Sequence, residues 1–329
     1  MTSLYRQILQ KAWQITKKLP YLWPLGVFAA FLGNGGEYQV LFRQSNFVSN
    51  QPEILSLWKE NLSVLMPNFN VSGTDVVFLF FTIVITLAIL AGFLWLIISC
   101  MGGLIKGAAL SKNDEKSSFK KLLMLGSKKF WSILGLNVIA KVIVYGILIL
   151  ILTPLMIASF SQGNNALNIA IVALTFLVFI PITIVVSLVT KYAAADVMLG
   201  GQKMWPGFKN GWRLFSANWL VSLEMAFVIF VINIFVGFLY ILASILIFSP
   251  FFFFGIINTI NAPELFNILI YTSITILLIL SAFVGAWLAT FQTSSWTLLY
   301  LRLTEGGKVY SKIVRWAASW PKKMKKDSV

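Results

Sequence analysis

Two charged residues stand well inside long apolar runs of this sequence, where an ionised side chain is costly and is a candidate for function. Counted from the tryptophan that opens each run, Lys141 lies about 15 Å along a helix and Glu224 roughly 7 to 8 Å. Asn137 and Tyr145 stand four residues before and after Lys141, so a helix would carry all three as one polar stripe. Because a lysine side chain can bend toward the membrane surface, Lys141 and Glu224 can meet.

This polar set has two interpretations. In the first, Asn137, Lys141, Tyr145 and Glu224 line a cavity that opens to the inner leaflet and handles an anion, a proton or a lipid headgroup. In the second, Lys141 and Glu224 form an ion pair that holds two membrane helices together. Since any charge within a membrane needs a partner, we favour the ion pair.

Other chemistry is limited by what the sequence lacks. It has no histidine and a single cysteine, Cys100. This excludes disulfides within the chain, the common zinc sites, histidine-held haem and histidine acid–base catalysis. The sequence also contains no Walker A motif, paired-carboxylate motif or metal-ligand cluster. We therefore expect no enzymatic activity, no cofactor and no metal.

The composition is that of an integral membrane protein. Of the 329 residues, 58% are hydrophobic and 11% are charged, against roughly 45–50% and 25% in soluble domains. The mean hydropathy is +0.84. These values exclude a soluble enzyme and a soluble binding module, and we expect one all-α membrane domain over residues 1–329.

Six apolar runs are candidate membrane spans, each long enough as a helix for the roughly 30 Å hydrocarbon core of a bilayer. The first is weakened by Pro20 and Pro24, and a signal peptide is its alternative. We favour a span, because the 19 residues before it are patterned as an amphipathic helix that lies on the membrane. The runs cover residues 21 to 42, 76 to 105, 131 to 160, 168 to 190, 217 to 248 and 265 to 301.

Two further features concern the last two runs. Residues 249 to 263 are too apolar for a solvated loop and too short to span, so they predict a re-entrant or interfacial segment. Small residues on the last run, Ala282, Ala286, Ala289 and Thr293, predict close contact with another helix.

The basic residues predict the orientation of the chain. With six spans, all but three of the 26 lysine and arginine residues fall on one side, the exceptions being Arg43, Lys59 and Lys141. The positive-inside rule then places both termini in the cytoplasm of a multi-pass cell-membrane protein. The basic residues that give the chain its net charge of +15 flank the apolar runs. We therefore expect anionic lipid headgroups at the cytoplasmic face as partners, and no nucleic acid.

An internal repeat organises these spans. Leu110 is followed nine residues later by Phe119-Lys120, and Leu199 is followed nine residues later by Phe208-Lys209. After each pair comes a basic amphipathic stretch and then a tryptophan. We interpret the chain as three parallel copies of an amphipathic helix followed by a hairpin of two spans. The copies cover about residues 1–110, 111–199 and 200–307, and a basic amphipathic tail covers 308–329.

The stretch KLPYLWPLGVFAAFLGNGG, the six spans and the repeated basic-aromatic connectors resemble prokaryotic membrane proteins grouped around the membrane domain of glycerophosphodiester phosphodiesterases. The likeness covers nearly the whole chain and is one of pattern, without a catalytic signature. In those phosphodiesterases a separate domain performs hydrolysis, and we expect no such domain in this chain. The resemblance therefore implies an architecture and no activity or site residues.

Two functions are compatible with these features. We favour a non-enzymatic scaffold or accessory protein that engages lipids or a partner through its cytoplasmic amphipathic helices. The alternative is a transporter or lipid-handling protein that uses the polar set around Lys141 and Glu224.

Overall fold

The computed structural model describes residues 4–32, 73–112, 115, 117–160, 165–258 and 263–305. Every element assigned among them is a helix, so the predicted all-α class is confirmed. The chain divides into two compact units, which are described separately. The first consists of Met1–Leu32, Ile97–Leu136 and Leu188–Val329, and the second of Gly33–Leu96 and Asn137–Ser187.

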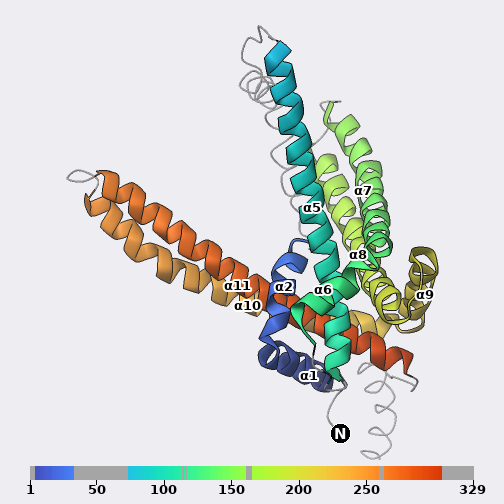
Figure 1. Ribbon diagram of the computed structural model, residues 1–329. Coiled ribbons are helices and arrows are strands. Elements are labelled where there is room, and N and C mark those ends of the chain that lie inside the picture. The colour runs from blue at the N-terminus through green and yellow to red at the C-terminus, as the bar shows by residue number, and fades with distance from the viewer. Residues whose placement is uncertain are drawn as a thin grey trace, which may run out of the picture. The chain divides into compact units, whose positions relative to one another are not determined.

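The chain consists of short helices followed by one or two long ones (Figure 1). The short elements are α1 (Leu4–Lys18), the 3-10 turn η1 (Pro20–Leu22), α2 (Trp23–Ala30), α6 (Phe119–Ser127) and α9 (Met204–Ala217). The long helices are α5 (Gly73–Lys112), α7 (Phe130–Phe160), α8 (Asn165–Leu199), α10 (Trp219–Asn258) and α11 (Pro263–Thr304).

Five helices of the described part are long and apolar enough to cross a membrane. They correspond to the second to sixth runs predicted from the sequence, the fifth of which begins two residues before α10. The first predicted run, residues 21 to 42, contains α2 and is described only as far as Leu32, so a sixth span stays a prediction. The basic tail predicted at 308–329 lies outside the described residues. The five candidate spans are Val77–Lys112, Phe130–Leu150, Leu177–Leu199, Trp219–Ile257 and Glu264–Thr304.

The re-entrant or interfacial segment predicted at residues 249 to 263 is wrong over most of its length. Helix α10 continues through Pro250 to Asn258, and α11 begins at Pro263. The apolar run after Pro250 favours a helix because a helix satisfies its own backbone within lipid, and membrane helices tolerate an internal proline. The end of α10 and the start of α11 also pack closely, since a Cβ atom on Gly255 would lie 2.8 Å from the ring of Phe266.

Helix α1 is bounded by ordinary local signals. Lys17 and Lys18 occupy its last turn, where cations favour the negative end of the helix dipole. Pro20 then excludes the helical conformation at Leu19 and starts η1. Helix α1 thus ends at Lys18, just before Pro20.

In the first unit, α10 and α11 form an antiparallel hairpin, and α1 and α2 pack beside α11 (Figure 1). A Cβ atom on Gly26 of α2 would lie 2.4 Å from the carbonyl oxygen of Ala286. The close contact predicted for the small residues of this span is therefore confirmed at Ala286. Most of the buried core of the unit comes from the last turns of α5, α8 and α11.

In the second unit, α7 packs against α8. Val144 and Leu148 of α7 surround Phe179 of α8, and all three side chains are buried. Val144 and Leu148 follow Lys141 on α7 by three and seven residues.

Candidate functional site

The structure places three of the predicted site residues on α7. Asn137, Lys141 and Tyr145 follow one another at helical spacing, as the sequence predicted. The ammonium of Lys141 lies 5.9 Å from the centroid of the Tyr145 ring, within the range of a cation–π contact. All three residues belong to the second unit.

Glu224, the fourth predicted residue, belongs to α10 in the first unit. Its Oε2 atom accepts a hydrogen bond from the hydroxyl of Tyr5 in α1. The ion pair of Glu224 with Lys141 joins residues of different units and stays a prediction. Sequence reasoning missed Tyr5, although a tyrosine on the apolar face of an amphipathic helix needs a polar partner when it is buried.

Helix α1 uses its apolar face to pack on protein. Ala12 is fully buried, and Tyr5, Ile8 and Ile15 are nearly so. Trp13 meets Trp287 edge to face with ring centroids 5.0 Å apart. The apolar face of α1 thus packs on α11, and Tyr5 reaches Glu224 of α10, while the expectation that α1 lies on the membrane stays a prediction.

Helix α9 has a protein-facing side of glycine. A Cβ atom on Gly211 would lie 2.8 Å from the backbone nitrogen of Ala193 and 2.9 Å from the carbonyl oxygen of Val189. Gly207 approaches Val197 with the same closeness. The two backbones can meet only because neither glycine carries a side chain.

The opposite side of α9 is aromatic and basic. Trp205 is 64% exposed and Trp212 is 52% exposed. Lys209 and Arg213 are exposed beside them, at positions that share this helix face. Tryptophan with lysine or arginine is the combination that occupies the boundary between hydrocarbon and headgroups.

Helix α6 repeats this arrangement on α5. A Cβ atom on Gly126 would lie 2.0 Å from the carbonyl oxygen of Ser99. Lys120, Lys121 and, just beyond the helix, Trp131 are exposed. We call α1, α6 and α9 the collar helices: α1 packs on α11, α6 on the last turns of α5, and α9 on those of α8.

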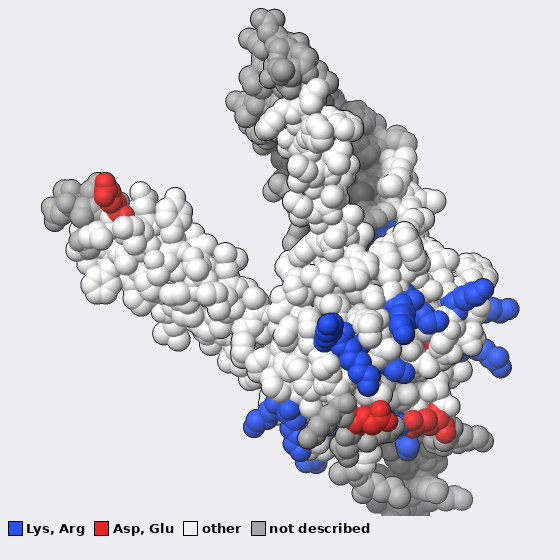
Figure 2. All heavy atoms as spheres, viewed as in Figure 1, with Lys and Arg blue, Asp and Glu red and all other residues white. Residues whose placement is uncertain are grey.

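Figure 2 shows the lysine and arginine side chains gathered around the collar helices, while the visible face of the α10–α11 hairpin carries none. The charged residues of these two helices are Glu224, Glu264 and Arg302. The first unit thus has a basic end and an apolar arm.

A buried carboxylate joins α8, α9 and α11. Asp196 is 9% exposed. Its Oδ2 atom accepts a 2.9 Å hydrogen bond from the amide of Asn210, and its Oδ1 atom accepts a 2.7 Å bond from the hydroxyl of Tyr300. One turn away, the ammonium of Lys191 lies 4.8 Å from the centroid of the Trp296 ring. The sequence analysis did not single out Asp196.

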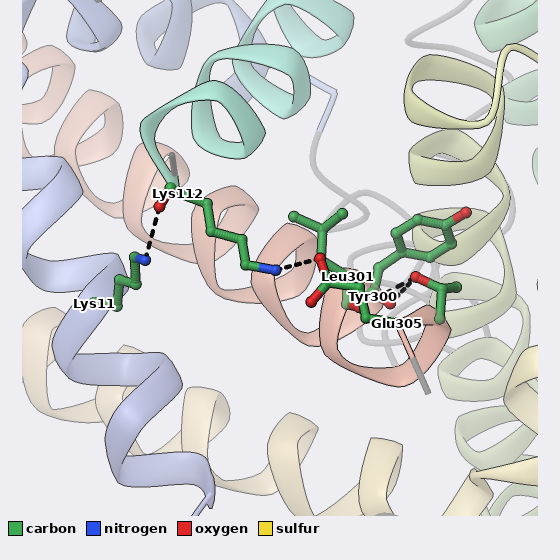
Figure 3. A network of polar contacts seen from close by, with 6 residues as sticks. Lys11, Lys112, Tyr300, Leu301 and Glu305 are labelled. Carbon is green, nitrogen blue, oxygen red and sulfur yellow. Dashed lines mark hydrogen bonds and ion pairs between the residues drawn. The ribbon is translucent and has the colours of Figure 1, made fainter. Parts of the chain in front are cut away.

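A second polar network connects α1 with the C-terminal ends of α5 and α11. Figure 3 shows Lys11 donating a 3.0 Å hydrogen bond to the carbonyl oxygen of Lys112, whose own ammonium pairs with Glu305. Both charged side chains of the ion pair are partly exposed, so it contributes little to stability by itself. Its position fixes which turns of these helices meet.

An apolar groove of 820 Å³ lies between α1, α2, α10 and α11. Its walls are mainly aromatic and aliphatic, and they include Trp13, Trp23 and Phe283. Of the described residues that line it, Lys17 alone carries a charge. The sequence analysis did not predict this groove, because it forms where the helix pair α1 and α2 meets the pair α10 and α11, which is far away in the chain.

These features are suited to binding an anionic or apolar ligand. They offer exposed cations beside tryptophans, and an apolar groove with one ammonium. Among the described residues, no group of three or more histidine, cysteine, aspartate and glutamate side chains could hold a metal ion.

Comparison with known proteins identifies a family whose function is unknown. No curated protein and no solved structure matches the chain. The resemblance to the membrane domain of glycerophosphodiester phosphodiesterases has no support from these comparisons and stays a prediction. A family described as "Domain of unknown function (DUF7847)" matches residues 7–299. Since this match covers most of the sequence, the chain belongs to the family of that domain of unknown function.

Proposed function

We propose that this chain is a non-enzymatic scaffold of the cell membrane that gathers anionic phospholipids of the cytoplasmic leaflet around its collar helices. The observation that carries the proposal is the opposition of the two faces of α9. Glycines bring one face against α8, while Trp205, Lys209, Trp212 and Arg213 stand on the exposed face.

The physical argument follows from where these side chains are stable. An indole ring favours the headgroup level, where its apolar body is shielded and its N–H remains wet. A lysine or arginine near an anionic membrane surface contributes about 1 kcal/mol. A helix that holds both on one face, and is fixed to the bundle by the other, attracts anionic lipid to a defined place.

The order of the helices supports a scaffold built from three repeats with both termini in the cytoplasm. α6, α7 and α8 form one short helix followed by two long ones, and α9, α10 and α11 form another. α1, α2 and α5 fit the same order when the predicted first span is included. The basic residues of the collar helices then lie on the cytoplasmic side by the positive-inside rule.

A transporter or lipid-handling protein is the alternative function. It would use Asn137, Lys141 and Tyr145, with Glu224 as the acidic partner. The bond of Glu224 to Tyr5 favours the scaffold, because it gives this carboxylate a structural role between α1 and α10.

The proposal is tested by comparing two arginine variants of the full chain. Arg213 belongs to the exposed face of α9, and Arg302 is an equally charged, exposed residue at the end of α11. Each variant, Arg213→Gln and Arg302→Gln, is purified in detergent and titrated with phosphatidylglycerol or phosphatidylcholine of the same acyl chains. The midpoint of thermal unfolding reports binding, since a ligand of the native state raises it.

We expect phosphatidylglycerol to stabilise the wild-type chain more than phosphatidylcholine does. Arg213→Gln should weaken the apparent affinity for phosphatidylglycerol about fivefold, and Arg302→Gln should not. Equal responses of the two variants, or equal effects of the two lipids on the wild type, would overturn the proposal.

A further inference from the structure

The groove between α1, α2, α10 and α11 has a length that matches one leaflet of a bilayer. Along α10 its lining runs from Ile232 to Ala243, and along α11 from Phe291 to Leu280. Each stretch rises about 16 Å along its helix. Half of the hydrocarbon core of a membrane is about 15 Å thick. Both stretches lie inside candidate spans, so the groove borders the lipid.

The two ends of the groove differ. Ile232 and Phe291 lie at the end that α1 covers, where both also line a smaller hollow beside Trp13. Lys17, one helical turn after Trp13, lines the groove but not this hollow. Ala243 and Leu280 lie at the other end, within the apolar arm.

The walls of the groove have few unsatisfied polar groups to offer a water-soluble ligand. The indole N–H of Trp23 donates a 2.8 Å hydrogen bond to the carbonyl oxygen of Thr16. The hydroxyl of Tyr240 is bonded to that of Ser281 at 2.6 Å. What remains is an aromatic groove lined by one cation, and its volume of 820 Å³ falls within the range of roughly 300–1,000 Å³ of small-molecule sites.

We propose that this groove holds one anionic phospholipid, with an acyl chain along α10 and α11 and its phosphate at Lys17. The inference deepens the proposed function, on which its choice of an anionic lipid rests. It adds a single stoichiometric site to the lipid layer gathered by α9. Charge selects the headgroup, and the match in length selects a lipid of the leaflet at the collar end.

The experiment counts phospholipids on the purified full chain by native mass spectrometry. Delipidated protein is titrated with phosphatidylglycerol and, separately, with phosphatidylcholine of the same acyl chains. Lys17→Gln removes the cation that lines the groove, and Lys18→Gln is its matched control, because Lys18 is exposed and does not line the groove. Lys17→Arg keeps the charge.

A second pair of variants tests the acyl-chain part. Ala243→Phe places a ring inside the far end of the groove, whereas Leu246→Phe changes an exposed residue of the same helix outside it. Unfolding midpoints of all variants identify any that fail to fold, and the Lys17 series then decides the outcome alone.

We expect one tightly retained phosphatidylglycerol per wild-type chain. Lys17→Gln should weaken its binding about fivefold, while Lys18→Gln and Lys17→Arg leave it unchanged. Ala243→Phe should weaken both lipids, and Leu246→Phe neither. Identical binding by Lys17→Gln and Lys18→Gln would overturn the inference.

The α9 variant separates this inference from the proposed function. Arg213→Gln should leave the single retained lipid in place, because Arg213 does not line the groove. If Arg213→Gln has no effect in the thermal titration while Lys17→Gln loses the bound lipid, the collar proposal fails and the groove site stands. The opposite pattern removes the groove site alone.

Discussion

Tyr300, near the end of α11, donates a 2.7 Å hydrogen bond to Asp196 of α8 across 104 residues of sequence. Asn210 of α9 donates to the other oxygen of the same carboxylate. A carboxylate inside a protein is costly unless its oxygens are hydrogen-bonded, and bonds to an ionised acceptor are the stronger kind. Asp196 therefore fixes a collar helix and the last long helix to one point.

Removing the hydroxyl of Tyr300 should leave one oxygen of Asp196 without this donor. We predict that Tyr300→Phe lowers the free energy of unfolding by about 1.5–3 kcal/mol, the usual range for a hydrogen bond to a charged group. Tyr271→Phe on the same helix is the control, because Tyr271 is 68% exposed. Denaturant unfolding in detergent measures both variants, and equal values for the two would contradict a structural role for this bond.

Glycine is required where α6 crosses α5. We predict that Gly126→Ala lowers the free energy of unfolding by about 1–3 kcal/mol, because the new Cβ atom would overlap the carbonyl oxygen of Ser99 and the helices must separate. Gly237 of α10 has no atom within 4 Å of a Cβ at that position. Gly237→Ala should therefore be neutral or stabilising by up to about 1 kcal/mol. The same unfolding measurement tests both, and a neutral Gly126→Ala would refute the close crossing.

The bond between Tyr5 and Glu224 should appear as an energetic coupling between α1 and α10. A double-mutant cycle of Tyr5→Phe and Glu224→Leu removes the donor and the acceptor separately and together. We expect a coupling energy of about 1.5–3 kcal/mol, since the acceptor is a carboxylate. Additive effects in unfolding experiments would show that the two side chains do not interact in solution.

The predicted ion pair of Lys141 and Glu224 is tested by a cycle of its own. We expect Lys141→Met and Glu224→Gln to be non-additive by more than about 0.5 kcal/mol if the two charges lie in contact. The control replaces Lys141→Met with Lys128→Met, which removes an exposed cation outside the apolar runs. A Lys141 cycle as additive as the Lys128 cycle would rule out the pair and leave Tyr5 as the identified partner of Glu224.

Much of the fold can be predicted from hydropathy, because a continuous apolar helix is stable in lipid. The run predicted at residues 131 to 160 and the observed helix Phe130–Phe160 differ by one residue at the start. The run predicted to end at residue 190 continues as helix to Leu199. Its last turns carry lysine, tyrosine and aspartate, yet they are buried by protein, a setting that a hydropathy window does not recognise.

Less of the candidate site could be predicted from the sequence, because its residues come together only through tertiary packing. Periodicity identified the apolar face of α1, but not that α11 would cover it. It also could not reveal that Tyr300 would reach Asp196, or that Ile232 and Phe291 would end the same groove. The polar stripe on α7 was predictable, because it depends on helical spacing alone.

The lipid proposals depend on the collar helices lying on the cytoplasmic side, and cysteine labelling tests this. In a Cys100→Ser background, which removes the single native thiol, cysteines are introduced singly at Lys18, Lys128 and Lys203, which are exposed residues of the three collar regions. A membrane-impermeant maleimide should label none of them in intact cells and all of them after permeabilisation. The reason is that an even number of spans separates the three positions and the positive-inside rule assigns them to the cytoplasm. Arg43→Cys, in the longest predicted outer loop, should label in intact cells and serves as the positive control. Labelling of Lys18→Cys alone in intact cells would show that the first predicted span does not cross, and labelling of all three collar positions would reverse the orientation and place the groove lipid in the outer leaflet.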